Sequence, residues 1–257
     1  TAAGLFVDSE IVQGAWAILL SHYSDAPSIV LGAAFSGRPA EVPGVESLIG
    51  PCVNNLPVRV TVTPGELLLP WLSSLQQRQF MLAEHQYASL EQIQKWSRVP
   101  WRYRLFDSLM VFQNYRVDEA ARRLGNDARL VPLVAPEATN YPLTIAVTPQ
   151  SELHFRLIYQ ADRFTGDVVR TYTADLLMLL RTISQVPGIA LAELTSRLPE
   201  STRGKAAALA AVKTPQSRVS YFAPTTATEL AVALVWQELF GVERVSLDDN
   251  FFDLGGH

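Results

Sequence analysis

The segment of the sequence that could do chemistry is residues 249–257, which read Asp-Asn-Phe-Phe-Asp-Leu-Gly-Gly-His. Gly255 and Gly256 free the backbone for a tight turn into a following helix. A phosphate attached at such a turn would lie against the backbone N–H groups of the first turn of that helix. Phe251 and Phe252 are predicted to be core residues that support this loop.

The histidines and the single cysteine indicate no further chemistry. Cys52 cannot form an intramolecular disulfide, and its apolar surroundings in the sequence predict a buried, unreactive thiol. The histidines lack the spacing that binds a metal; they are His22, His85, His154 and His257. The sequence thus predicts no metal site, and its cysteine usage fits a reduced, cytoplasmic setting.

The composition predicts a large core and argues against nucleic acid as a partner. Of the 257 residues, 48% are apolar and 18% are charged, enough for one large domain or for a medium and a small one. The formal net charge is −4, with acidic and basic residues mixed. The sequence therefore predicts no basic face that would bind nucleic acid.

No apolar run reaches the length of a membrane span, and the N-terminus does not resemble a signal peptide. The chain does not begin with Met and stops in Gly-Gly-His. We therefore expect it to be a piece of a longer protein without a membrane partner.

Up to about residue 195 the pattern predicts helices mixed with strands. The predicted helices cover 8–23 and 64–87, and a third is capped by Thr165. The predicted strands cover 28–35, 56–62, 108–115, 143–148 and 152–160, the last two as a hairpin. Helices and strands without a repeat indicate an α/β layered domain.

The character of the sequence changes after this domain. Residues 198–222 are punctuated by Pro and Gly and rich in small and polar residues, which predicts a linker. A capping box, Thr226 to Glu229, then predicts the start of a helix that Gly241 is placed to end. The domain boundaries are accordingly predicted as 1–197, 198–222 and 223–257.

The last segment, from Thr226 to His257, resembles the first helix and following loop of a peptidyl carrier protein, a small all-α helical bundle. In that family a serine directly follows Leu-Gly-Gly-His and carries 4'-phosphopantetheine, attached by a phosphopantetheinyl transferase. The resemblance implies an attachment serine directly after His257, and an attachment motif made of Asp253, Leu254, Gly255, Gly256 and His257.

Residues 4–195 resemble the C-terminal lobe of a condensation domain of nonribosomal peptide synthetases. The stretches that carry the resemblance are Gln13–Leu20, Phe35–Glu46, Ile49–Val60, His85–Glu91, Leu105–Tyr115 and Asn140–Leu143. The family fold is a pair of chloramphenicol-acetyltransferase-like lobes, each a mixed sheet with flanking helices. The resemblance implies such a lobe here, without its N-terminal companion.

The implied activity is amide-bond formation between a donor thioester on an upstream carrier and the amine of an acceptor on the downstream carrier. The family's catalytic motif, His-His-x-x-x-Asp-Gly, belongs to the N-terminal lobe, and no His-His pair occurs in this sequence. Its second histidine suits proton transfer near neutral pH. No catalytic residue is therefore expected in this chain, which alone should be inactive and should depend on the missing lobe.

In the family the two phosphopantetheine arms enter a tunnel from opposite ends. Polar residues that could line it from this lobe are Asn54, Asn55, Ser108, Asn140 and Tyr141. Asparagines beside strands also commonly satisfy turns, so a structural role stays open for each. The sequence departs from the usual family pattern at Pro51, Cys52 and Asn55, which could change the tunnel's shape or acceptor preference.

Two questions stay open. The upstream motif would separate condensation from an epimerisation or cyclisation variant, and from a non-catalytic lobe that only docks carrier proteins. Residues 198–205 also faintly resemble the end of an adenylation domain, although a solvated linker is the favoured interpretation. No adenylation domain fits between lobe and carrier, so the carrier would be loaded in trans, or such a domain has been lost.

Overall fold

The computed structural model describes residues 8–38, 42–50, 52–97, 99, 103–113, 123–124, 128–129, 139–149, 152–205, 221–240, 242–249, 251 and 254. Its main sheet has five strands in the order β2-β1-β3-β6-β7. In chain order these strands are β1 (Ser28–Phe35), β2 (Asn54–Thr61), β3 (Ser108–Phe112), β6 (Leu143–Pro149) and β7 (Leu153–Tyr159). A short ribbon pairs β4 (Arg123–Leu124) with β5 (Ala128–Arg129).

The sheet is mixed, as the resemblance implies. The three central strands β1, β3 and β6 run parallel, and the edge strands β2 and β7 are antiparallel to their neighbours. Pro57 lies within β2, opposite Gly32, rather than at the start of the strand. A proline is tolerated there because β2 is an edge strand.

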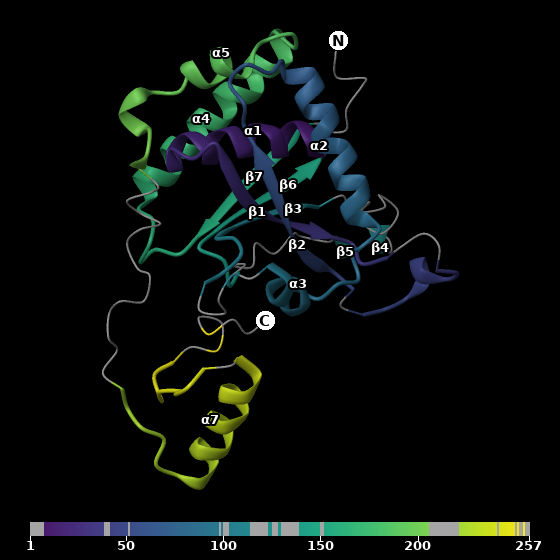
Figure 1. The fold of residues 1–257 in the computed structure, drawn as a ribbon. Coiled ribbons are helices and arrows are strands. Elements are labelled where there is room, and N and C mark those ends of the chain that lie inside the picture. The colour runs from purple at the N-terminus through teal and green to yellow at the C-terminus, as the bar shows by residue number, and fades with distance from the viewer. Residues whose placement is uncertain are drawn as a thin grey trace.

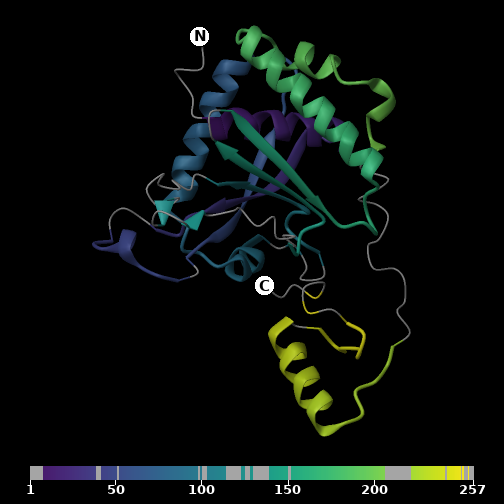
Figure 2. The same cartoon turned by 180° about the vertical axis from the view of Figure 1, so that it is seen from behind.

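The helices that build the core are α1 (Asp8–Ser24), α2 (Leu68–Ala83), α4 (Gly166–Gln185) and α5 (Leu191–Ser196). Their apolar side chains pack with those of the sheet in one buried cluster, in which Trp16 and Leu179 are fully buried. Figures 1 and 2 show α1 crossing the strands, with α2 on one side of it and α4 on the other. The predicted α/β layered lobe is confirmed.

Most predicted elements are confirmed, with differences at their ends. Thr165 caps α4 as expected, its hydroxyl accepting a hydrogen bond from the Val168 N–H at 3.4 Å. The helix predicted over 64–87 is too long at both ends, since α2 begins at Leu68 and stops at Ala83, where a turn follows. Helix α3 (Leu90–Ser97) is not among the predicted elements.

The signal for α3 is a capping box. The Ser89 hydroxyl accepts from the Gln92 N–H at 3.2 Å, and the Gln92 side chain accepts from the Ser89 N–H at 3.2 Å. This reciprocal pair satisfies N–H groups at the helix start. It has the same spacing as the capping box predicted at Thr226.

The packing of the lobe continues past residue 197 to Gly204. Leu198 belongs to the buried core, and a short 3-10 helix, η3 (Glu200–Thr202), follows. The His22 ring lies 3.1 Å from both the Pro199 carbonyl oxygen and the Thr202 hydroxyl, and the Gly204 N–H donates to the His22 carbonyl at 3.2 Å. Residues 198–204 thus pack against the lobe, whereas the sequence predicts a solvated linker that begins at residue 198.

The segment from residue 221 onward contains a helix and a loop that packs against it. Its helix α7 (Ala227–Phe240) begins with the predicted capping box: the Thr226 hydroxyl accepts from the Glu229 N–H at 3.2 Å, and Glu229 accepts from the Thr226 N–H at 2.9 Å. The Thr226 and Thr225 backbone N–H groups both donate to the Glu229 carboxylate and lower its pKa. Gly241 lies outside the described residues.

The apolar residues of α7 are only partly buried. Phe240 is 3% exposed and meets the rings of Trp236 and Phe251 edge-on, at 6.2 and 5.3 Å between centroids. Leu230, by contrast, is 47% exposed, and Leu234 and Val235 are 63% and 61% exposed. The aromatic residues therefore form the core of this segment, and Phe251 supports the loop as expected.

The described part of the chain contains no helix long and apolar enough to cross a membrane. Among the same residues, no group of three or more His, Cys, Asp or Glu side chains is placed to hold a metal ion. Cys52 carries a free thiol and is only partly buried, so the sequence analysis predicted more complete burial than the fold gives it.

Candidate functional site

The candidate site is built around Phe106, just before β3. Leu31 and Ala33 point from β1 into the helix-covered core, so Gly32 between them faces the other side of the sheet. The Phe106 ring lies directly over Gly32, where a Cβ atom would approach its Cε2 to 2.1 Å. Glycine at this position is what lets the ring lie this close to β1.

Tyr141 and Asn55 lie next to Phe106. The Tyr141 ring stacks on Phe106 at 5.1 Å between centroids and 17° between planes. Asn55 faces the same side of the sheet, since it pairs with Ala34, two residues after Gly32. The Asn55 side chain lies near the Tyr141 hydroxyl and lowers the pKa of that phenol. The structure thus joins two of the five predicted tunnel residues into one polar pair on the helix-free face.

The electrostatics of this pair keep the phenol neutral at ordinary pH. Burial raises the pKa of Tyr141, while the nearby Asn55 amide and the positive charge of Arg104 partly lower it. The phenol can therefore donate a proton in a hydrogen bond to a ligand oxygen, or accept one from a ligand N–H.

Ser108 has a structural partner on the helix side. Its hydroxyl, on a residue only 7% exposed, accepts a hydrogen bond from the Trp16 indole N–H at 2.9 Å. Because Trp16 is fully buried, this is how its N–H is satisfied. Ser108 also lines a cavity of about 400 Å³.

Asn54 and Asn140 do not join the pair through their side chains. The Asn54 amide donates to the carbonyl oxygens of Gln86 and Ala88, at 2.8 and 2.7 Å, and so holds the turn between α2 and α3. The Asn140 side chain is exposed, and its backbone carbonyl accepts from Arg104 at 2.5 Å. In these contacts both residues act as scaffold.

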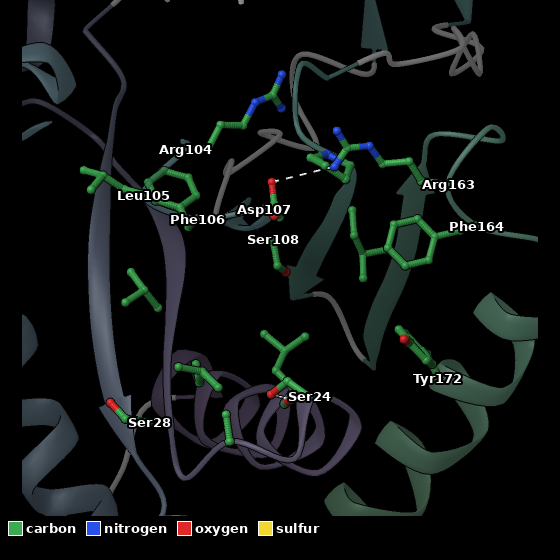
Figure 3. A pocket seen from close by; sticks show the side chains of 16 residues that line it. Ser24, Ser28, Arg104, Leu105, Phe106, Asp107, Ser108, Arg163, Phe164 and Tyr172 are labelled. Atoms are coloured by element: carbon green, nitrogen blue, oxygen red, sulfur yellow. Dashed lines mark hydrogen bonds and ion pairs between the residues drawn. The ribbon is translucent and has the colours of Figure 1, made fainter. Parts of the chain in front are cut away.

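The cavity beside Ser108 also holds residues that the sequence analysis missed. Arg104, Arg163 and Asp107 contribute its charged groups, and Figure 3 shows Asp107 joined by an ion pair to Arg163. Three lone charged residues, separated in the sequence, carry no motif. Only the fold brings Arg163 to the start of β3.

The predicted attachment motif lies mostly outside the described residues. Leu254 is described and half-buried; Phe252, Asp253, Gly255, Gly256 and His257 are not described. Before them, the Asp249 carboxylate accepts from the Ser246 N–H at 2.6 Å. A side chain of the loop that leads to the motif thus hydrogen-bonds the backbone of the same loop.

The first two hundred residues are similar to a known protein family. The family model described as "Condensation domain" matches residues 9–203, which include the segment packed on His22. Chondramide synthase cmdD of Chondromyces crocatus is 37% identical over 70% of this chain. Surfactin synthase subunit 3 of Bacillus subtilis is 30% identical over 70% of it. The chain covers 5% and 14% of those two proteins, so it corresponds to a small part of each.

Solved structures show the same fold. A four-domain nonribosomal peptide synthetase bound to AMP and glycine aligns with 74% of this chain and 16% of its own, at a TM-score of 0.61 and 14% identity. The X-domain from teicoplanin biosynthesis in complex with OxyB aligns with 75% of this chain and 43% of its own, at 0.61 and 22% identity. This chain therefore belongs to the condensation-domain family of nonribosomal peptide synthetases.

Proposed function

We propose that this chain is the acceptor-side lobe of a condensation domain that forms an amide bond between a donor thioester and an acceptor amine. The observation that carries the proposal is the family match over residues 9–203, which covers the site around Phe106. The synthase names of the relatives support it. The histidine that would move the proton belongs to the upstream lobe.

Within this lobe, Asn55 and Tyr141 are the residues proposed to line the tunnel. They lie on the face of the sheet that α1, α2, α4 and α5 leave uncovered, and Asn55 is near enough to lower the pKa of the Tyr141 phenol. A neutral phenol and an amide can orient a thioester carbonyl or an amine without taking up its charge. Their role is to position the acceptor, and no proton transfer is assigned to them.

We further propose that residues 223–257 begin a peptidyl carrier domain whose serine, directly after His257, carries 4'-phosphopantetheine. The capping box of α7 and the aromatic core around Phe240 support a small helical domain here. The partners in this proposal are an upstream donor carrier, the N-terminal lobe, a phosphopantetheinyl transferase, and an adenylation domain acting in trans.

The positioning role is tested in the longer protein that contains both lobes. Donor and acceptor carriers are loaded, and the single-turnover rate of amide formation is measured for Tyr141→Phe and Asn55→Ala. We expect each variant to lower that rate about tenfold, as the loss of one positioning hydrogen bond does. Rates equal to the parent protein in both variants would remove these residues from the proposed tunnel.

The carrier proposal has a separate test. The longer protein is treated with coenzyme A and a phosphopantetheinyl transferase, and the peptide containing Leu254–His257 is examined by mass spectrometry. We expect one phosphopantetheinyl group on the residue after His257. An unmodified peptide, with a known carrier modified in the same reaction, would contradict the proposal.

A further inference from the structure

The cavity beside Ser108 exists because the sheet opens there. β1 pairs with β3 only at two positions, Gly32 with Leu109 and Ala33 with Met110. The first half of β1 therefore diverges from the segment that precedes β3, and a space of about 400 Å³ remains between them. Its apolar wall comes from several elements: Leu20, Ile29, Phe106, Leu143 and Phe164.

Tyr172 of α4 contributes a buried hydroxyl without a partner. The residue is 1% exposed and lines the cavity, and its Oη makes no hydrogen bond within the described part of the chain. Figure 3 shows the side chain reaching from α4 toward the cavity, below Phe164. Burial raises the pKa of Tyr172 to about 12, so it stays a neutral donor. An unsatisfied buried donor is unfavourable and calls for an acceptor atom in the cavity.

The charged groups of the cavity are two arginines and one aspartate. Arg163 lies 4.0 Å from Asp107, and its side chain is 27% exposed against 55% for Asp107. Together with Arg104, the lining carries a net charge of +1. A guanidinium binds a carboxylate through two parallel N–H groups. A single negative charge balances this lining, whereas a dianionic phosphate would leave excess negative charge beside Asp107.

We propose that this cavity binds a free carboxylic acid that has an apolar body and one internal carbonyl oxygen, the class to which N-acyl amino acids belong. The carboxylate lies against Arg163 and Arg104, the carbonyl oxygen accepts from the Tyr172 hydroxyl, and the acyl chain packs on Phe106 and Phe164. The site is independent of the proposed amide-bond formation, because it requires neither a carrier protein nor the upstream lobe.

The test is a calorimetric titration of the 257-residue chain with N-hexanoylglycine. We expect one saturable site, and no saturable binding of the methyl ester, which lacks the negative charge. Arg163→Gln should weaken binding about tenfold, and Tyr172→Phe about fivefold. Tyr172→Phe removes only an unpartnered hydroxyl, so the unliganded fold should be retained.

Matched controls are Arg170→Gln and Tyr159→Phe, which change residues outside the cavity lining. Both should bind N-hexanoylglycine as the parent chain does. The proposal is overturned if the parent chain shows no saturable binding, if the ester binds equally well, or if the cavity variants bind like the controls. Loss of binding when the upstream lobe is joined to the chain would show that the lobe fills the cavity, and would equally overturn it.

Discussion

The ring of Phe106 occupies the space that a side chain at Gly32 would need, with 2.1 Å between the ring and the site of a Cβ atom. This one contact fixes the height of Phe106 over the sheet. Through the stacked Tyr141 ring it also fixes where the phenol meets Asn55. The candidate site therefore depends on the absence of one methyl group.

Gly32→Ala should destabilise the lobe by about 1–3 kcal/mol, because the added methyl group displaces a ring packed against the backbone. The measurement is urea unfolding followed by tryptophan fluorescence. Gly188→Ala is the control, since no atom lies within 4 Å of a Cβ there. Equal stability of the two variants would show that Phe106 moves aside without cost.

Ser108→Ala should cost about 1–3 kcal/mol, because it leaves the Trp16 indole N–H buried without an acceptor. A double-mutant cycle with Trp16→Phe measures the coupling directly. Ser184→Ala is a suitable control, since that serine is exposed and bonds only the Arg181 carbonyl of its own helix. Zero coupling energy between Trp16 and Ser108 would contradict the structural role assigned to this hydrogen bond.

Asn54→Ala should loosen the turn between α2 and α3 more than it lowers global stability. The substitution removes two hydrogen bonds, to the carbonyl groups of Gln86 and Ala88. Amide hydrogen exchange should become faster in residues 84–97, which the hydrogen bonds hold against β2. Asn140→Ala, which changes an exposed side chain, should leave exchange there unaltered. Unchanged exchange in both variants would contradict the structural role of Asn54 and leave it only as a candidate tunnel residue.

The stability of the lobe should fall between pH 10 and about 12. Burial raises the pKa of Tyr172 from 10.0 to about 12, and burial together with the hydrogen bond to Asp175 also raises the pKa of Tyr23. The unfolded chain loses these protons at lower pH than the folded one. The stabilising contribution is therefore complete below pH 10 and is lost as pH rises through the folded pKa.

Tyr172→Phe should flatten this pH dependence, as measured by urea unfolding over that range, with the remaining slope due to Tyr23. Tyr159→Phe, at a position 37% exposed, should leave it as in the parent chain. A slope that is the same in Tyr172→Phe as in the parent would contradict the burial effect.

The sequence predicts the elements well because periodicity and capping are local. The predicted first helix and strand match α1 and β1 almost to the residue, and the helix caps at Thr165 and Thr226 are where the pattern places them. One failure is local: α3 is not predicted, although Ser89 and Gln92 carry the spacing of a capping box. The second failure is not local. Residues 198–204 have the composition of a linker, and the partner that they pack against, His22, lies far away in the sequence, so no local pattern predicts the contact.

The site could be predicted only in part, since a resemblance gives positions and not contacts. It named Asn55 and Tyr141, which do meet, but gave no reason to separate them from Asn54, whose amide holds a turn. Arg163 and Tyr172 gave no signal at all. Their proposed role depends on the opening between β1 and β3, and no residue pattern within either strand predicts that opening.

The central claim is that this chain is one lobe of an amide-forming enzyme and that the catalytic histidine belongs to the other. It is tested most directly by a single-turnover assay with loaded donor and acceptor carriers, comparing the 257-residue chain alone with the same chain joined to its upstream lobe. We predict product only from the joined protein, and none when the second histidine of its His-His-x-x-x-Asp-Gly motif is changed to Ala. Product from the chain alone, or a joined protein that forms no amide bond, would contradict the account.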